Sequence, residues 1–253
     1  MAVDEAILEA VGAQASQPVL RLYAWEPPCL SLGYAQPIAD VDLDRLAAYG
    51  WELVRRPTGG RAILHTDELT YSVIGPLDEP RLAGSVLESY QRLAKALLHA
   101  LTLLDAPAQA NPNTPLPGTP KGPVCFEVPS NYEITVDGKK LIGSAQARRR
   151  EGVLQHGSLP LVGDLKRITL GLNYPSESDR SAAAERLLAH ATTLEAALGR
   201  PVAWESAAQA FTTAFGQALN LTFEVTQLTQ AELCRADELV AEKYANPEWT
   251  NRS

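Results

Sequence analysis

The feature that most constrains the fold of this chain is an Asp-Gly pair, Asp137 and Gly138, between two apolar runs. A type I′ turn needs a positive φ at both central residues, and Asp-Gly is one of the pairs that it favours. The flanking runs, NYEITVD and KLIGSAQ, are therefore predicted to be neighbouring antiparallel strands. A third strand is predicted at residues 152–161. These hairpins do not fit a strict alternation of parallel strands and helices.

Further strands are predicted where β-branched and aromatic residues gather between turn residues, at 18–25, 29–34, 51–56, 61–65, 69–75 and 221–228. Apolar residues at helical spacing predict helices at 2–11, 42–49, 85–104, 187–198, 207–219 and 229–240. Two of these helices begin with capping boxes, Ser85 with Glu88 and Thr229 with Glu232. We therefore expect an α+β fold.

The chain is predicted to form a single domain over residues 1–253, a length that supports a core without disulfides or metals. Residues 107–123 contain six prolines and almost no large apolar side chains. The little apolar surface that such a stretch can bury does not offset the conformational entropy that it would lose on becoming ordered. We therefore expect a flexible loop inside the domain. A linker between two domains is the alternative.

Charge and cysteine content exclude several classes of partner. The 22 basic and 30 acidic residues give a net charge of −8, which argues against binding nucleic acid. No apolar run reaches the roughly 18 residues that span a membrane, and no signal peptide is apparent, so we expect a cytoplasmic protein. Three widely spaced cysteines and four histidines without HExxH or CxxC spacing predict no metal site.

A glycine-centred loop, Arg55 to Arg61, joins two predicted strands. Gly59 and Gly60 let the backbone approach a ligand closely, and the neighbouring arginines favour an anionic or carbonyl-bearing group. A hairpin turn with solvated arginines is the alternative, because no Walker loop is present.

Cys125 lies at the exit of the proline-rich segment, where a substrate could reach it. A nucleophilic thiol needs a nearby cation, because with a pKa of ~8.5 only about 3% is thiolate at pH 7. Lys140, at the start of the predicted strand KLIGSAQ, is the candidate cation. The alternatives are a buried, unreactive Cys125 and a solvated Lys140, as expected for Lys139.

Other polar residues receive weaker predictions. His156 lies in a predicted strand beside Gly157, where a structural histidine is the commoner outcome. His99 and His190 are expected to be solvated, and packing is expected to explain Cys29 and Cys234. Residues 148–150 form an Arg-Arg-Arg run, which is either a solvated turn or a docking patch for an acidic partner protein.

Together these motifs resemble the lipoate/biotin protein ligase superfamily. The segments that carry the resemblance are RRPTGGRAILHTDELTYSV, CFEVPSNYEITVDGKKLIGSAQ and LQHGSLPL, supported by MAVDEAILEA, RLYAWEPPCLSLGY and EKYANPEW. The chain is most similar to the cysteine-dependent protein octanoyltransferases of lipoate assembly. The resemblance implies a single catalytic domain with a mixed sheet packed by helices, related to the cores of biotin protein ligases and class II synthetases. Members usually have a strand before the helix that begins here at Met1, which points to a truncated or misassigned start.

The resemblance also implies a reaction. Such transferases carry an octanoyl group as a cysteine thioester from acyl carrier protein to a lysine of a lipoyl-carrier protein, such as glycine cleavage H protein or a lipoyl domain. Cys125 matches the nucleophile and Lys140 the lysine that lowers the thiol pKa. The candidate substrate-binding residues are Arg56, Thr58, Gly59, Gly60, Arg61, His65, Gly143, Ser144, Ala145, His156 and Gly157. No cofactor is implied.

Two alternatives remain. An ATP-dependent lipoate ligase would need ATP and Mg²⁺ and no cysteine. Against it stand the sequence GGR where similar ligases have GGG, the lack of room for their accessory domain, and the segment CFEVPS. A non-catalytic module that binds acyl carrier protein or lipoyl domains should lack Cys125 or Lys140, and both are present.

Overall fold

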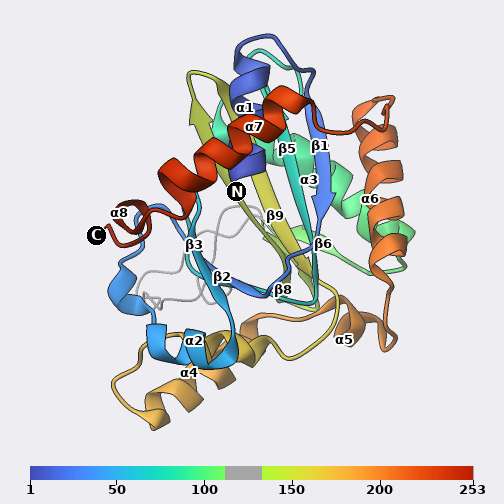
Figure 1. Ribbon diagram of the computed structural model, residues 1–253. Coiled ribbons are helices and arrows are strands. Elements are labelled where there is room, and N and C mark those ends of the chain that lie inside the picture. Colours follow the sequence, from blue (N-terminus) through green and yellow to red (C-terminus); the bar gives the residue numbers. More distant parts are fainter. Residues whose placement is uncertain (112–132, 253) are drawn as a thin grey trace.

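The computed structural model of the protein describes residues 1–111 and 133–252, and its larger sheet forms the centre of the molecule (Figure 1). Neighbouring strands of this sheet are antiparallel throughout the described residues. Their spatial order is β1 (Val19–Tyr23), β5 (Glu68–Gly75), β9 (Gly152–Pro160), β8 (Lys139–Arg149), β7 (Glu133–Val136) and β6 (Gln109–Asn111). The hairpin predicted at Asp137 and Gly138 joins β7 to β8, and both residues have positive φ, 49° and 77°.

A smaller sheet lies beside the first. Its central strand β2 (Cys29–Leu32) pairs in parallel with β3 (Glu52–Arg55) and antiparallel with β4 (Ile63–His65). Strands β3 and β4 therefore lie on opposite sides of β2, and the predicted glycine-centred loop joins them. This sheet makes the fold mixed, as expected.

Helices cover both faces of the larger sheet (Figure 1). On one face α3 (Val86–Leu103) and α6 (Trp204–Leu219) bury their apolar stripes in the main core, together with Tyr71 of β5. On the other face α1 (Ala2–Gly12) packs on β5 and β9 through Ile7 and Leu8, and α7 (Gln230–Leu239) packs on α1. Both predicted capping boxes are present, at the starts of α3 and α7.

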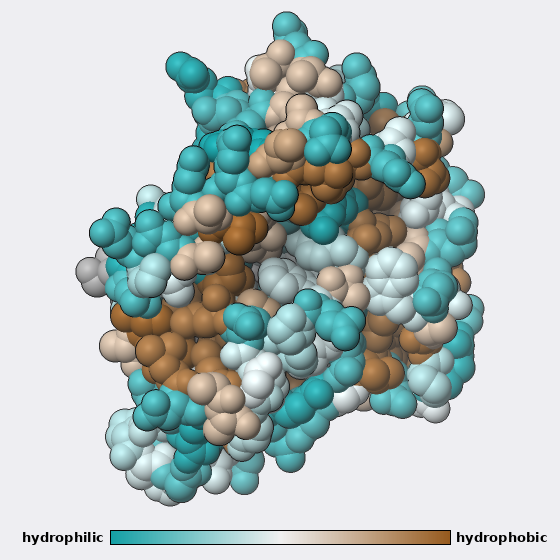
Figure 2. Space-filling view, viewed as in Figure 1, coloured by the Kyte–Doolittle hydropathy of each residue, from teal (hydrophilic) through white to brown (hydrophobic). Residues whose placement is uncertain are grey.

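The remaining elements lie beside the smaller sheet, against the main core in the case of α5, or in the C-terminal segment. They are η1 (Ile38–Asp40), α2 (Leu43–Tyr49), η3 (Leu165–Gly171), α4 (Glu177–His190), α5 (Leu194–Leu198), the π-helical turn η4 (Val240–Tyr244) and α8 (Pro247–Thr250). Apolar surface is visible between the C-terminal helices and α2 (Figure 2). Within the described ranges, no helix is both long enough and apolar enough to cross a membrane.

Three predictions about local structure were wrong. The helix expected at 187–198 is two helices, because Ala191 leaves the helix to form a bridge with Lys140 and Thr193 caps a new one. Residues 221–228 form no strand, since they pair with no strand of the described chain and Val225 is 97% exposed. Residues 109–111, expected in the flexible loop, form β6 against β7. Residues 112–123 of that loop lie outside the described residues.

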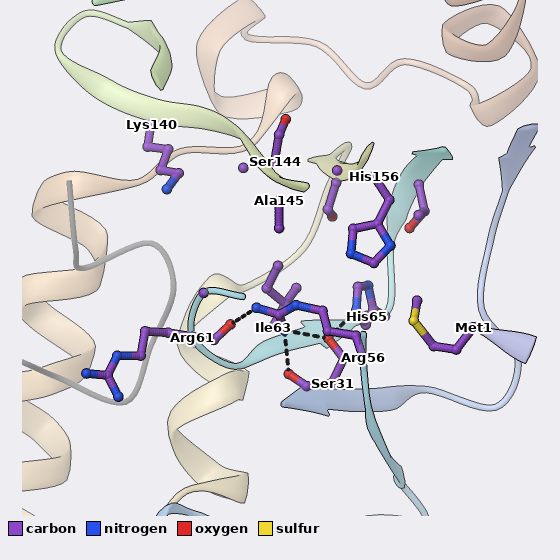
Figure 3. A pocket seen from close by; sticks show the side chains of 15 residues that line it. Met1, Ser31, Arg56, Arg61, Ile63, His65, Lys140, Ser144, Ala145 and His156 are labelled. Carbon is purple, nitrogen blue, oxygen red and sulfur yellow. Dashed lines mark hydrogen bonds between the residues drawn. The ribbon is translucent and has the colours of Figure 1, made fainter. Parts of the chain in front are cut away.

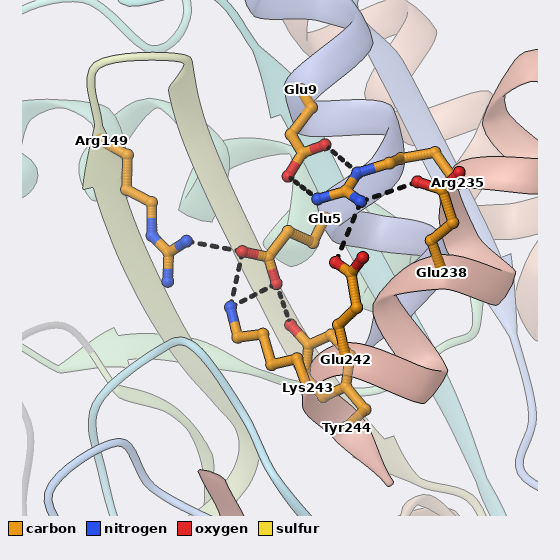
Figure 4. A network of polar contacts seen from close by, with 8 residues as sticks. All are labelled: Glu5, Glu9, Arg149, Arg235, Glu238, Glu242, Lys243 and Tyr244. Atoms are coloured by element: carbon orange, nitrogen blue, oxygen red, sulfur yellow. Dashed lines mark hydrogen bonds and ion pairs between the residues drawn. The ribbon is translucent and has the colours of Figure 1, made fainter. Parts of the chain in front are cut away.

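Glu5 of α1 ties the C-terminal segment to the rest of the fold (Figure 4). Its buried carboxylate accepts hydrogen bonds from Lys243 Nζ at 2.6 Å, from Arg149 at 2.7 Å and from the Tyr244 hydroxyl. Burial alone would raise the pKa of Glu5, but the bonds from Lys243 and Tyr244 keep it below its ordinary value. The carboxylate is therefore charged and fully paired.

Replacing Glu5 by Gln should lower the free energy of unfolding by about 2–3 kcal/mol at pH 7, because Lys243 and Arg149 lose their buried anion. The pKa of Glu5 is lower in the folded than in the unfolded state. The stabilisation by its carboxylate is therefore fully present above the unfolded-state pKa of ~4.3 and is lost as the pH falls through the folded-state pKa. Urea unfolding at pH 7 and pH 3 measures this. The matched control is Glu9→Gln on the same helix, whose half-exposed pair with Arg235 should be worth under ~1 kcal/mol. Equal losses in both variants would contradict the prediction.

Candidate active site

Residues of both sheets line a cavity of about 280 Å³. Strands β8 and β9 form one side, and β2 with the β3–β4 loop and β4 forms the other (Figure 3). Ten predicted site residues line it: Arg56, Gly60, Arg61, His65, Lys140, Gly143, Ser144, Ala145, His156 and Gly157. Sequence reasoning missed Met1, Ser31, Ile63, Thr70 and Ser158. The volume lies near the lower end of the ~300–1,000 Å³ typical of small-molecule pockets.

Close packing explains the glycine on β9. A Cβ on Gly157 would lie 2.5 Å from Tyr71 and 2.6 Å from the carbonyl oxygen of Gly143. Only glycine therefore lets β5, β9 and β8 approach at the floor of the cavity.

The Arg56 guanidinium shapes the β3–β4 loop. It is buried and donates to the carbonyl oxygens of Ser31, Gly59 and Arg61 at 2.7–3.2 Å. Arg56 also lines the cavity, and the expectation that the arginines of this loop favour an anionic or carbonyl-bearing group stays a prediction. The Arg61 side chain points away from the other labelled residues (Figure 3).

Two predicted site residues lie behind the cavity lining. Thr58 is buried and its hydroxyl is 2.6 Å from His156 Nε2. Gly59 is exposed, and its carbonyl accepts the Arg56 hydrogen bonds. Both residues therefore position neighbours rather than line the space.

Lys140 is buried at the edge of the cavity, which excludes the alternative of a solvated hairpin lysine. Its ammonium lies 2.9 Å from the buried carboxylate of Glu133 on β7. Lys139 is exposed, as predicted, and donates to the carbonyl of Leu188. The alternation along β8 thus directs the first lysine outward and the second inward.

His156 faces the cavity as a neutral ring, because burial lowers its pKa to about 3. Its Nε2 contacts Thr58, and no described residue forms a hydrogen bond with its buried Nδ1. An unpaired buried polar atom is costly unless a ligand satisfies it. His156 can therefore bond to a polar group of the substrate.

His65 lies in a buried polar network. Its Nδ1 is hydrogen-bonded to Glu68, its Nε2 is 2.8 Å from Ser31 Oγ, and its ring stacks on Trp25 with centroids 4.2 Å apart. Glu68 also accepts from Thr70 and Ser158. The only sequence signals for Ser31 and Glu68 were polar residues in otherwise apolar strands.

Cys125 lies outside the described residues, so the predicted pairing with Lys140 stays a prediction. Cys29 cannot serve instead, because burial raises its pKa to about 12. Cys234 is exposed on α7, so the expectation that packing explains this cysteine was wrong.

The Arg148–Arg150 run is not simply a solvated turn. Arg148 donates to the carbonyl of Leu82 and to the side chain of Gln146, and Arg149 donates to the carboxylate of Glu5.

Arg55, next to the glycine loop, is fully buried without a carboxylate partner among the described residues. Its guanidinium donates to the backbone carbonyls of Gly33, Tyr34, Gln36, Thr250 and Arg252 at 2.6–3.2 Å. Burial lowers its pKa. Arg55 thus fastens the C-terminal segment to the loop after β2.

Arg55→Lys should lower the free energy of unfolding by about 2–4 kcal/mol, because an ammonium cannot reach carbonyls on both sides. Urea unfolding checks this. Arg81→Lys is the control: Arg81 also donates to carbonyls, of Leu219 and Asn220, but is partly exposed and should cost under ~1 kcal/mol. A loss at Arg55 no larger than at Arg81 would contradict this role.

Comparison with known proteins identifies the family. The sequence profile of the lipoyl protein ligase A/B catalytic domain matches residues 1–216. A protein named octanoyltransferase LipM from Symbiobacterium thermophilum is 42% identical over 257 residues, covering 100% of this chain and 93% of the relative. Another with the same name, from Kyrpidia tusciae, is 41% identical with the same coverage.

Solved structures show the same fold. A bipartite lipoate protein ligase from Thermoplasma acidophilum, solved with its E2 lipoyl domain, matches with a TM-score of 0.81 at 24% identity, covering 99% of this chain and 89% of that one. A lipoate-protein ligase A bound with ATP matches with a TM-score of 0.79 at 25% identity, covering 99% and 92%. By profile, sequence and fold, the chain belongs to the lipoyl protein ligase A/B catalytic domain family.

Proposed function

We propose that this chain is an acyltransferase that moves an octanoyl group from octanoyl-acyl carrier protein, through a thioester on Cys125, to a lysine of a lipoyl-carrier protein. The observation that carries the proposal is the cavity that holds the buried ammonium of Lys140 beside the predicted substrate-binding residues. The name octanoyltransferase on relatives 41–42% identical over the full chain supports it.

The proposed reaction begins with the thiolate of Cys125. Lys140 supplies the positive charge that favours the thiolate, and Glu133 holds its ammonium in place. The thiolate attacks the octanoyl thioester, and the carrier's thiolate leaves. The proposed donors for the oxyanion are those backbone N–H groups of residues 143–145 that are not bonded to β9, and the neutral ring of His156, to whose Nδ1 no described residue bonds.

The acyl-enzyme then reacts with the ε-amine of the target lysine. The C–S bond breaks as the amide C–N bond forms, and the octanoylated carrier protein leaves. Neither half-reaction requires a cofactor. Lipoyl-carrier proteins such as glycine cleavage H protein or an E2 lipoyl domain are the proposed acceptors.

A lipoate ligase is the second candidate, because the chain shares its fold with a lipoate-protein ligase A that binds ATP. That enzyme class activates the free acid as an acyl-adenylate and so needs no thioester donor.

The experiment compares donors. The chain is incubated with an apo lipoyl domain and either octanoyl-acyl carrier protein alone or free octanoate with ATP and Mg²⁺. Mass spectrometry then follows octanoylation of the lipoyl domain. We expect transfer with the first donor only. Transfer with the second donor only would replace the proposal by the ligase, and no transfer with either donor would favour a binding module.

A further inference from the structure

The two half-reactions differ in their need for a base. In the first, one thiolate attacks a thioester and another leaves, so no proton has to move. In the second, the attacking group is a lysine with a pKa of ~10.4, which is mostly ammonium at neutral pH. Its nitrogen loses two protons on the way to an amide. A proton acceptor beside the acyl group is therefore needed only in the second half-reaction.

Among the described residues that line the cavity, one titratable side chain is a suitable acceptor that already has a carboxylate partner. Arg56 and Arg61 are permanent cations. The ammonium of Lys140 is paired with the carboxylate of Glu133 at 2.9 Å, so it is already engaged as a donor to an anion. No carboxylate of the described residues is hydrogen-bonded to His156, so none balances an added proton there. His65 remains.

The contacts of His65 determine which of its two ring nitrogens can accept a proton. A carboxylate only accepts hydrogen bonds, so the bond to Glu68 places a proton on His65 Nδ1. Nε2 of the neutral ring is then the acceptor, and Ser31 donates its hydroxyl proton to it across 2.8 Å. The stack on Trp25 and the bonds from Thr70 and Ser158 to Glu68 hold this geometry.

Ser31 connects this pair to the cavity. Its hydroxyl donates to His65 and accepts from Arg56 at 3.2 Å. A hydroxyl oxygen has two acceptor sites, so one remains for a proton donor in the cavity that Ser31 and His65 both line. The charges around the pair are the Glu68 carboxylate and the Arg56 guanidinium, with neutral His156 nearby on β9.

We propose that Ser31, His65 and Glu68 form a proton relay that deprotonates the target lysine during the second half-reaction. The inference rests on the proposed function and deepens it. Ser31 accepts a proton from the ammonium of the target lysine as it passes its own to His65 Nε2. Glu68 is a positioning residue that balances the imidazolium charge.

The protons and bonds balance. One proton of the lysine ammonium passes through Ser31 to His65 as the attacking amine is formed. The amine loses its second proton to the departing sulfur or to water as the C–N bond forms and the C–S bond breaks. His65 then releases its proton to water, and no redox change occurs.

The test separates the half-reactions. Each variant is loaded with octanoyl-acyl carrier protein, freed of donor, and mixed with an apo lipoyl domain, and intact mass follows loss of the acyl-enzyme. We expect His65→Gln and Ser31→Ala to acylate within a few-fold of the wild type but to transfer roughly 10²-fold more slowly. Glu68→Gln, which keeps the shape and removes the charge, should slow transfer about 10-fold.

A second nucleophile distinguishes the relay from a structural role. Hydroxylamine is already a free base at neutral pH, so it should discharge the acyl-enzyme of every variant at the wild-type rate. His99→Gln is the control, since His99 is partly exposed on α3, does not line the described part of the cavity and is hydrogen-bonded to Gln217. Wild-type transfer to lysine in His65→Gln and Ser31→Ala, or equal slowing with hydroxylamine, would overturn the relay. Absence of a wild-type acyl-enzyme would instead overturn the proposed function.

Discussion

Cys125→Ser is expected to abolish the acyl-enzyme and to reduce octanoyl transfer at least ~10³-fold, because a serine hydroxyl without a general base is a far weaker nucleophile than a thiolate. The measurement is intact mass after incubation with octanoyl-acyl carrier protein, followed by peptide mapping of the labelled residue. The wild type should gain one octanoyl group on Cys125.

The matched control is the double variant Cys29→Ala with Cys234→Ala. Cys29 is buried with a raised pKa, and Cys234 is exposed on α7 away from the described cavity lining. This variant should keep the adduct. An adduct that survives Cys125→Ser, or one that disappears in the control, would assign the nucleophile elsewhere.

Lys140→Met is expected to slow acylation roughly 10- to 100-fold at pH 7. A lowering of the thiol pKa by ~1.5 units raises the thiolate fraction from about 3% to about half, and the buried cation also stabilises charge near the acyl carbonyl. The deficit should shrink as pH rises toward 9, because the thiol then ionises without help. Single-turnover acylation at several pH values measures both effects.

Lys139→Met is the control for the lysine. It removes the same charge one residue away, but Lys139 points outward to the carbonyl of Leu188. Acylation should stay within about 2-fold of the wild type. A deficit in Lys140→Met that persists unchanged at pH 9 would mean that the lysine does not act through the thiol.

Much of the architecture could be predicted because it depends on local signals. The Asp-Gly turn, the two capping boxes and the alternation of Lys139 and Lys140 each follow from a few neighbouring residues. The errors arose where contacts with residues far away in the sequence determine the local structure. Residues 221–228 have strand-like composition but no strand to pair with, and the bridge from Ala191 to Lys140 interrupts a helical pattern.

The candidate site shows the same difference between features that local sequence signals reveal and features that depend on residues far apart in the sequence. The resemblance identified residue types that face a common cavity, including Lys140 and His156. The resemblance could not indicate where the Arg56 guanidinium donates its hydrogen bonds. Its acceptors are backbone carbonyls of β2 and of the β3–β4 loop. Nor could spacing reveal Ser31 and Glu68, since only the pairing of β2 with β4 brings position 31 beside His65.

The central claim is that the ammonium of Lys140 ionises the thiol of Cys125, and the rate of alkylation of Cys125 by iodoacetamide as a function of pH tests it most directly. The Cys29→Ala, Cys234→Ala background confines the reaction to one thiol. We predict a midpoint clearly below the ordinary ~8.5 with Lys140 present, and a rise toward ~8.5 in Lys140→Met. The same midpoint in both proteins would contradict the account.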